Sequence, residues 1–359
     1  MKLRDLKYLT AYIIPMLAML GIQRGGMLSG AAVIFAFGLV PLLDPLFKDR
    51  SAPDPSNEVH RKKSVFFFDL LLYLNVPLVG IALYLFADAL THRALSTGEI
   101  TWMTLSVGTM LGACGINVAH ELGHRNSAFE QFLAILLLLP NHYMHFFIEH
   151  NRGHHRWVST EHDPASARRG QNIYSFFIQT VVGSYLSAWK IQRTMLKADQ
   201  KSFLSLSNAM LLFHLLSGLY LLMLALFFGL KTALVIALSG MVGFMLLETI
   251  NYIEHYGLRR KKVDAERYER VMPHHSWNSN HILGRIILYE LTRHSDHHYK
   301  ASKHYQLLEH RPESPQLPFG YPTAMLLSLI PPLWFRIIHP RLRATEELAS
   351  NDRVEKRGV

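Results

Sequence analysis

Cysteine is nearly absent from this 359-residue sequence, and the single Cys114 lies inside an apolar segment. One thiol cannot form a disulfide within the chain, a four-thiolate iron site or an iron–sulfur cluster. Charged residues are also scarce, at 18% of the chain, and no repeat of the solenoid type is visible. If the chain catalyses redox chemistry, its electrons must therefore come from another protein.

Long apolar blocks dominate what is present, because 50% of the residues are hydrophobic. Several blocks reach the roughly 20 residues that a helix needs to cross a bilayer. The first block leads straight into another, so we interpret it as a span and not as a cleaved targeting segment. The sequence predicts an all-α integral membrane protein with six transmembrane helices, near residues 8–22, 26–47, 65–90, 101–119, 207–230 and 232–252.

Basic residues indicate the orientation of these spans. Lys2, Arg4 and Lys7 precede the first span, and residues 48–63 between the second and third spans are also basic, whereas the loops at the other end carry few cations. The positive-inside rule then places both termini and every long polar segment in the cytoplasm. The net charge of +10 suits this anchoring, and no aromatic or groove-reading pattern accompanies it, so we expect no nucleic-acid binding.

Two further segments have helical character but are not assigned as spans. Residues 129–147 are apolar yet contain Pro140, and counting them as a span would reverse the later loops, so we interpret them as a buried or interfacial helix. Residues 174–197 mix aromatic residues with Lys190, Arg193 and Lys197 at helical spacing. That pattern favours a helix lying along the membrane surface.

Histidine is abundant, and nine of the 21 histidines fall into four motifs. The first, His120-Glu-Leu-Gly-His124, closes the fourth expected span. Residues four apart share a helix face, so both imidazoles can bind one ion. The other motifs are Glu149-His150-Asn-Arg-Gly-His154-His155, Asn251-Tyr-Ile-Glu-His255 and His294-Ser-Asp-His297-His298.

The number of imidazoles predicts two metal ions. A catalytic zinc uses about three protein ligands, whereas two ions with four or five imidazoles each would use all nine. Imidazole suits iron, copper and zinc alike, so the ligands alone leave the metal and the assignment of each histidine open. The candidate ligands are His120, His124, His150, His154, His155, His255, His294, His297 and His298. Four neighbouring carboxylates are candidates to orient them by accepting their second N–H: Glu121, Glu149, Glu254 and Asp296.

Other interpretations explain part of this pattern. His120-Glu121-Leu-Gly-His124 matches the zinc metalloprotease pattern, but an intramembrane protease would leave seven histidines unused. A metal transporter would place its ligands near the bilayer midplane, whereas these lie at span ends. Six more histidines stay open as neighbours of the site: His142, His145, His162, His274, His275 and His281.

The extended motifs resemble those of the membrane-bound di-iron desaturases and hydroxylases with three histidine boxes, and among these the bacterial alkane 1-monooxygenases. The resemblance covers most of the chain. The form Asn251-Tyr-Ile-Glu-His-Tyr-Gly is similar to the alkane and xylene hydroxylase branch. The stretches that carry it are His120 to Arg125, Glu149 to Thr160 continuing to Asp163-Pro-Ala165, Asn251 to Leu258, and Arg293 to His298.

This resemblance implies two non-haem iron ions and hydroxylation of the terminal methyl of medium-chain n-alkanes to 1-alkanols with O2. A rubredoxin with its reductase would donate electrons, and the enzyme would lie in the bacterial inner membrane. Residues 1–359 would be one membrane-embedded hydroxylase domain with cytoplasmic catalytic parts at 120–206 and 253–359. A xylene-type or fatty acyl substrate is the alternative within the same family.

That interpretation predicts a substrate channel and a docking surface for the electron donor. An alkane has no polar group, so its binding depends on burial, at about 0.8 kcal/mol per CH2. Phe35 or Phe37 in the second span is the candidate to limit chain length in such a channel. A basic cytoplasmic surface could steer an acidic rubredoxin, and its candidates are Arg152, Arg156, Arg168, Arg169 and Arg259 to Lys262.

Overall fold

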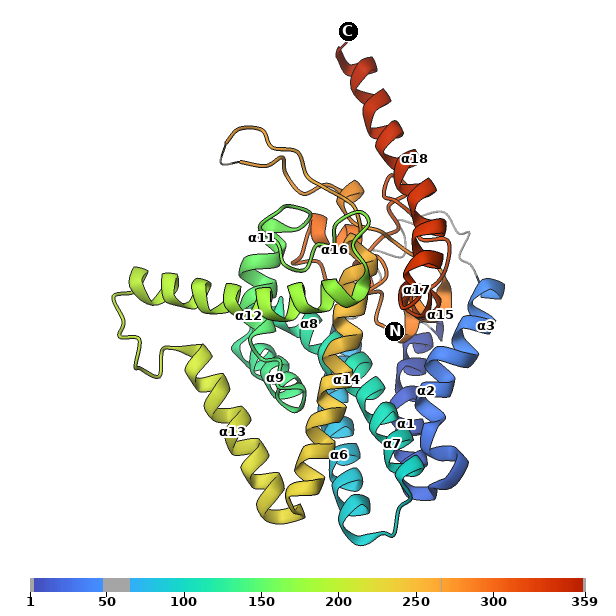
Figure 1. Cartoon of the computed structure of the whole chain (residues 1–359), viewed down its shortest axis with the longest axis vertical. Coiled ribbons are helices and arrows are strands. Elements are labelled where there is room, and N and C mark those ends of the chain that lie inside the picture. The colour runs from blue at the N-terminus through green and yellow to red at the C-terminus, as the bar shows by residue number, and fades with distance from the viewer. Residues whose placement is uncertain (1–2, 48–64, 266, 358–359) are drawn as a thin grey trace.

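The computed structural model describes residues 3–47, 65–265 and 267–357, and this part of the chain is largely helical (Figure 1). Two isolated bridges, Lys262 with Tyr268 and Asn278 with Gln316, are its strand-like pairs. Within the described residues six helices are long and apolar enough to cross a membrane: Asp5–Arg24, Gly26–Phe47, Phe66–His92, Thr97–Gly123, Ala209–Phe228 and Leu230–His255. They confirm the six predicted spans, each to within four residues. The basic residues 48–63 lie outside the described residues.

Several spans combine α-helix with tighter or wider turns. The first is η1 (Leu3–Tyr12) and α1 (Ile13–Arg24), and the third is α5 (Val65–Tyr73) and α6 (Asn75–His92). The second consists of η2 (Gly26–Gly30), α2 (Ala31–Ile34), η3 (Phe35–Leu39), α3 (Val40–Leu43) and η4 (Asp44–Phe47). The fourth consists of α7 (Thr97–Met110), η5 (Leu111–Ile116) and α8 (Asn117–Gly123). The fifth and sixth are α13 (Ala209–Phe228) and α14 (Leu230–His255).

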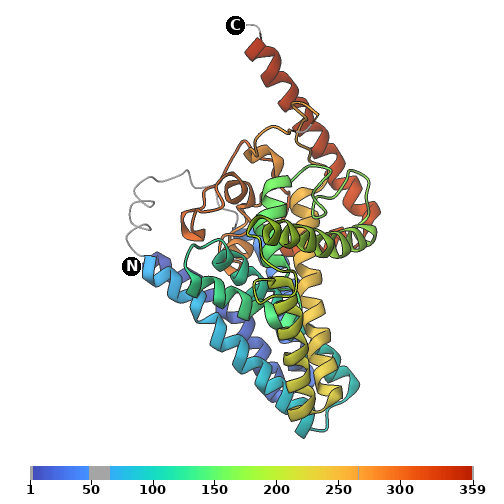
Figure 2. The ribbon, with the colours of Figure 1, turned by 90° about the vertical axis from the view of Figure 1, so that its left-hand side faces the viewer.

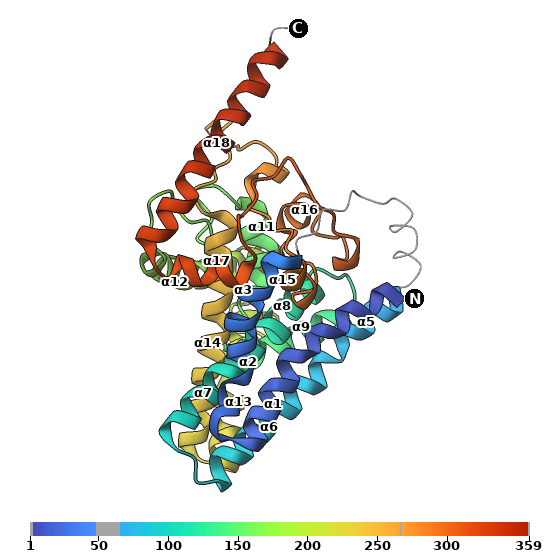
Figure 3. The same ribbon diagram turned by 90° about the vertical axis from the view of Figure 1, so that its right-hand side faces the viewer.

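Short polar turns join the spans into hairpins at one end of the molecule. Gly25 and Gly229 adopt positive φ values of 66° and 86°, which residues with a side chain rarely adopt, and so end α1 and α13. Ser96 and Glu99 form a capping box that starts α7. Figure 2 shows the spans converging toward this end, and Figure 3 shows α1 running beside α6.

The remaining helices gather at the opposite end of the spans. They are α9 (Ala128–Leu138), η6 (Leu139–Asn141), α10 (Phe146–Glu149), η7 (His150–His154), α11 (His155–Trp157), α12 (Ile173–Ala198), η8 (Pro273–His275), α15 (Ile282–Ile287), α16 (His294–Tyr299), η9 (Tyr305–Leu307), α17 (Tyr321–Ser328) and α18 (Pro331–Arg357). α12 lies across the spans and α18 projects away from them (Figure 1). The predicted helix at 129–147 ends at Asn141, and the apolar helix Ala128–Asn141 is too short for the spanning set.

Small residues allow the sixth span to pack closely against the fourth span and against η6. A Cβ atom on Gly108 would lie 2.5 Å from the Val242 Cβ, and one on Gly240 would lie 2.2 Å from the Pro140 carbonyl oxygen. Helices inside a membrane gain van der Waals contact through such close approach, because lipid supplies no hydrophobic driving force between them. This packing holds α14 in place, and α14 ends at His255.

Replacing Gly240 with Ala is expected to destabilise the protein, because its methyl group would overlap the Pro140 carbonyl. The cost of such overpacking is about 1–3 kcal/mol. Thermal unfolding in detergent should show a lower midpoint for Gly240→Ala. Gly218→Ala on α13 is the matched control, since a Cβ there meets nothing within 4 Å and Ala favours the helix. An unchanged midpoint for Gly240→Ala would contradict the close packing.

Candidate metal centre

The structure brings together all nine candidate histidines, although they come from four separate segments. Their ligand atoms divide into two compact groups, and within each group these atoms lie within 4.8 Å of one another. The five-histidine set consists of His120, His124, His150, His155 and His297. The four-histidine set consists of His154, His255, His294 and His298. The division into five and four could not be read from the sequence.

The Nε2 atoms of the five-histidine set face one another. Nε2 of His150 lies 3.1 Å from that of His124 and 3.0 Å from that of His155. Nε2 of His297 lies 3.0 Å from that of His120 and 3.2 Å from that of His155. These contacts link the five rings in a chain whose ring nitrogens point toward a common centre.

The four-histidine set has the same geometry. Its Nε2 atoms are 3.2 Å apart between His154 and His298, and 3.1 Å apart between His294 and His255. The two sets are adjacent, since the ring centroids of His155 and His298 lie 4.5 Å apart. Two ions held by the two sets would therefore be neighbours.

A π-helical turn explains how the second histidine motif serves both sets. In an α-helix, His150 and His154 would share a face. The structure has a π-helix over His150–His154 instead, and its wider turn brings His155 beside His150 while His154 joins the other set. The expectation that residues four apart bind one ion therefore holds for His120 with His124 and for His294 with His298, but not here.

Burial keeps most of these imidazoles neutral. Burial and the neighbouring imidazoles lower the pKa of His124 to about 3. The same causes lower the pKa well below its usual value for His150, His155, His294, His297 and His298. Neutral imidazole keeps the lone pair that a metal ion needs, so these side chains are ready to bind without first losing a proton.

The donor geometry fits a transition-metal ion. Metal–imidazole bonds are about 2.1 Å long, which separates neighbouring nitrogens of an octahedral site by about 3 Å. The observed Nε2 separations of 3.0 to 3.2 Å match that spacing. An ion at the centre of each set would therefore meet ligand nitrogens at its preferred spacing.

The carboxylates beside the motifs contact other groups than the predicted ones. Glu121 accepts hydrogen bonds from Arg125 and from the Tyr305 backbone N–H, and Asp296 accepts them from Lys303 and Arg311. The hydroxyl of Ser187 donates to Glu149. These residues join the loops around the motifs and contact no imidazole of the two sets.

Glu254 does reach a histidine, but at the metal-facing nitrogen. Its Oε2 lies 3.1 Å from Nε2 of His294, and its Oε1 accepts a hydrogen bond from Tyr321. Its carboxylate therefore lies beside the centre. It does not orient an imidazole through the ring nitrogen that faces away from the centre.

Asp163 is the carboxylate that contacts a histidine at the ring nitrogen facing away from the centre. Its motif in the sequence does not by itself indicate this role. Its Oδ2 lies 3.0 Å from Nδ1 of His154, which leaves Nε2 to face the four-histidine set. Burial disfavours a charge on His154, but the charge and hydrogen bond of Asp163 outweigh burial and raise the pKa of His154. The signal in the sequence is the motif His162-Asp-Pro, whose Asp163 lies nine residues after His154.

The six histidines left open lie outside both sets. His275 and His274 form a third group with Glu269. Nδ1 of His275 accepts the Met272 backbone N–H and its Nε2 lies 3.2 Å from Glu269, so both ring nitrogens are engaged within the protein. Hydrogen bonds within the loop thus hold the His275 ring in this group.

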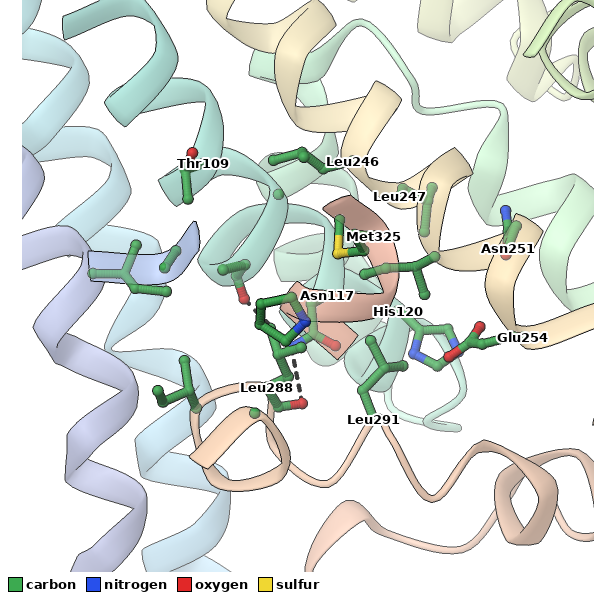
Figure 4. Close-up of a pocket in the computed structure, with 18 of the residues that line it drawn as sticks. Thr109, Asn117, His120, Leu246, Leu247, Asn251, Glu254, Leu288, Leu291 and Met325 are labelled. Atoms are coloured by element: carbon green, nitrogen blue, oxygen red, sulfur yellow. Dashed lines mark hydrogen bonds between the residues drawn. The ribbon is translucent and has the colours of Figure 1, made fainter. Parts of the chain in front are cut away.

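An apolar cavity leads from the spans to the two sets. Both Phe35 and Phe37 line it, placed there by the π-helical turn Phe35–Leu39. Figure 4 shows Leu288, Leu291 and Met325 between Thr109 at one side and Glu254 at the other. His120 and His150 of the first set and His294 of the second also line it. A hydrophobic molecule in this cavity would reach the metal centre.

These features define the class of the protein. Transmembrane helices that end in two histidine sets beneath an apolar cavity are the expected architecture of a membrane hydroxylase or desaturase. Residues 99–325 match the fatty acid desaturase family.

Similarity to known proteins narrows this class. The chain is 40% identical over 311 residues to alkane 1-monooxygenase 2 of Pseudomonas aeruginosa, covering 86% of this chain and 82% of the relative. It is 36% identical over 339 residues to alkane 1-monooxygenase 2 of Alcanivorax borkumensis, covering 93% and 88%. It is also 33% identical to the xylene/toluene monooxygenase hydroxylase component of Pseudomonas putida over 350 residues, covering 92% and 88%. The chain belongs to the alkane 1-monooxygenase family and is a multi-pass membrane enzyme.

Replacing Asp163 with Asn tests the support of His154. The amide cannot supply the charge that holds the imidazole, and loss of such support weakens metal binding about 10- to 100-fold. Metal retained per chain after dialysis against a chelator should therefore fall for Asp163→Asn. Glu161→Gln is the matched control, because Glu161 is exposed and pairs with Lys262 at the surface. Equal retention in the two variants would show that Asp163 does not support the site.

Proposed function

We propose that the chain is a di-iron alkane monooxygenase that hydroxylates the terminal methyl of medium-chain n-alkanes to 1-alkanols. The observation that carries this proposal is the apolar cavity that ends on histidines of both sets. The reaction consumes one alkane, one O2, two electrons and two protons, and it yields one alcohol and one water. One iron would be held by the five-histidine set and the other by the four-histidine set.

The chemistry divides between the metals and the chain. Bound iron would supply the activation of O2, which no side chain of the cavity can provide. The chain's own residues hold the substrate, exclude water and keep the imidazoles neutral. Glu254 borders both the cavity and His294, so its carboxylate is placed to accept or return a proton at Oε2 beside the reacting end of the substrate.

The cavity favours a substrate without a charged end. No Lys or Arg is among the described residues that line it, so a fatty acyl headgroup would find no cation there. Selection of a terminal carbon then depends on the shape of an apolar channel. Phe35 and Phe37 lie in its wall and are the candidates to limit chain length.

A second cleft suits the entry of electrons from a rubredoxin supplied by its reductase. Arg152, Arg156 and Arg168 line it and are exposed, and Asp163, hydrogen-bonded to His154, also lines it. An acidic donor docked there would lie close to the four-histidine set. Of the basic run at Arg259 to Lys262, Arg259 and Arg260 bind backbone carbonyl groups, so the exposed arginines form the better docking surface.

The position of the N-terminal helix suggests how the protein is oriented in the membrane. The N-terminal helix contacts the histidine end of the molecule, where Tyr8 donates a hydrogen bond to Glu290 just before α16. Together with the basic N-terminal residues, this favours the bacterial inner membrane with both termini and the metal centre on the cytoplasmic side.

Two alternatives remain as outcomes of a test. The xylene/toluene relative makes a methyl-substituted aromatic substrate the second candidate. The zinc protease is disfavoured, because Glu121, its required general base, is bound by Arg125 and Tyr305.

Purified protein in detergent should settle the function. We expect two irons and little zinc per chain by elemental analysis, and 1-dodecanol from dodecane with rubredoxin, its reductase and NADH. His298→Ala should retain about one iron, whereas His162→Gln, outside both sets, should retain two. Oxidation of m-xylene but not of dodecane would show that the substrate is a methyl-substituted aromatic. One zinc per chain together with peptide cleavage would show that the protein is a protease and not a monooxygenase.

The chain-length role of Phe35 and Phe37 can be tested by truncation. Phe35→Ala or Phe37→Ala should enlarge the cavity and extend the longest alkane hydroxylated by several carbons, as measured on a series of n-alkanes. Phe66→Ala is the control, because that ring is 77% exposed at the start of the third span. An unchanged product profile would mean that the two rings only pack.

Charge reversal tests the donor cleft. The double variant R152E/R156E should raise the KM for rubredoxin about tenfold at low salt and leave kcat little changed, because steering acts on encounter. High salt should remove the difference. Lys231→Glu, at the opposite end of the spans, is the control. A KM that is insensitive to both salt and charge reversal would place the donor elsewhere.

A further inference from the structure

The helix α12 exposes an apolar stripe along one face. Tyr174, Ile178, Val182 and Leu186 are four residues apart, and 52% to 72% of each side chain is exposed. The opposite face, at positions such as Phe176, is buried. Because α12 lies across the ends of the spans (Figures 1 and 2), the stripe is placed to lie in the membrane interface.

A basic groove continues this stripe toward the end of α12. Lys190 follows Leu186 by four residues, and the groove contains both apolar and cationic side chains. We call it the α12 groove; its residues are Leu186, Trp189, Lys190, Arg193, Thr194, Leu196, Lys197, Lys201 and Phe203. The Trp189 ring stacks on Phe203 with centroids 5.8 Å apart, and the Arg193 guanidinium lies 5.5 Å from the Phe203 centroid.

Three of the four cations of the α12 groove form no ion pair within the described part of the chain. Within the described part of the chain, Lys190, Arg193 and Lys197 are exposed and form no ion pair, whereas Lys201 pairs with Asp199 at 3.7 Å. The helix dipole favours a cation in the last turn, which accounts for Lys197. It does not account for Lys190 and Arg193, which lie before that turn.

Apolar side chains complete the site on its membrane side. The loop at 199–208 joins α12 to the span α13 and lies on the same side of α12 as that span (Figure 1). Leu204 and Leu206 in this loop are 81% and 89% exposed. Gln192 donates a hydrogen bond to the Ser207 carbonyl and so ties the loop to α12.

We infer that the α12 groove binds an anionic phospholipid. Its phosphate would contact Lys190, Arg193 and Lys197, Trp189 would lie at the level of the glycerol, and the acyl chains would run past Leu204 and Leu206. Charge complementarity requires an anion, and the adjoining apolar residues require one that carries a hydrocarbon. The inference is independent of the reaction that the metal centre catalyses.

Tryptophan quenching in nanodiscs tests this site. Brominated lipids quench a nearby indole, and subtracting the spectrum of Trp189→Phe isolates the signal of Trp189. At equal mole fraction, brominated phosphatidylglycerol should quench that signal at least twofold more than brominated phosphatidylcholine. In the triple variant K190Q/R193Q/K197Q, the two brominated lipids should quench the Trp189 signal equally. The control R152Q/R156Q/R168Q removes three exposed cations from the other cleft and should keep the preference.

Three results would overturn the inference. These are equal quenching by both lipids in the unmodified chain, an unchanged preference in the K190Q/R193Q/K197Q variant, and cross-linking between copies through α12 with exclusion of lipid. The variant K190R/K197R keeps the charge and should keep the preference, so it separates loss of charge from loss of fold. Circular dichroism and gel filtration in detergent check that each variant is folded.

Discussion

The convergence of nine imidazoles, all of them buried or partly buried, is the constraint on which the rest of the structure depends. Facing ring nitrogens at 3.0 to 3.2 Å have the spacing that one bound ion would impose on its ligands. Each segment that contributes a histidine must therefore end or turn at the same place. The fourth span ends there at Gly123, directly before His124, the sixth ends at His255, and α16 begins there at His294.

Buried charges hold these segments against one another. Glu121 joins Arg125 to Tyr305 at the start of η9, Asp296 joins Lys303 to Arg311, and Glu290 joins Arg285 and Arg293 beside α16. Breaking one partner of such a cluster leaves an uncompensated charge in a site without water. Glu121, Asp296 and Glu290 thus fix the positions of the loops, and none of the three lines the apolar cavity, where Glu254 is the carboxylate.

The spans and the candidate ligands were predictable because their signals are local. A block such as Ala209–Phe228 is apolar along its whole length, and the motifs place histidines three to five residues apart within one helix. The roles of the carboxylates were not predictable, because their partners lie far away in the sequence. Glu121 bonds Tyr305 across 184 residues, and Phe35 faces a cavity whose other walls are α14, α15 and α17.

By itself the sequence determined six membrane helices and the nine histidines that gather at one end of them, since hydropathy and helical spacing act within a single segment. The tertiary structure alone decided which histidines share a centre. The π-helical turn at His150–His154 separates His154 from His150, and α16 sends His297 to one set and His298 to the other. These choices depend on how four distant segments are rotated about their axes, and that rotation is fixed only when they pack together.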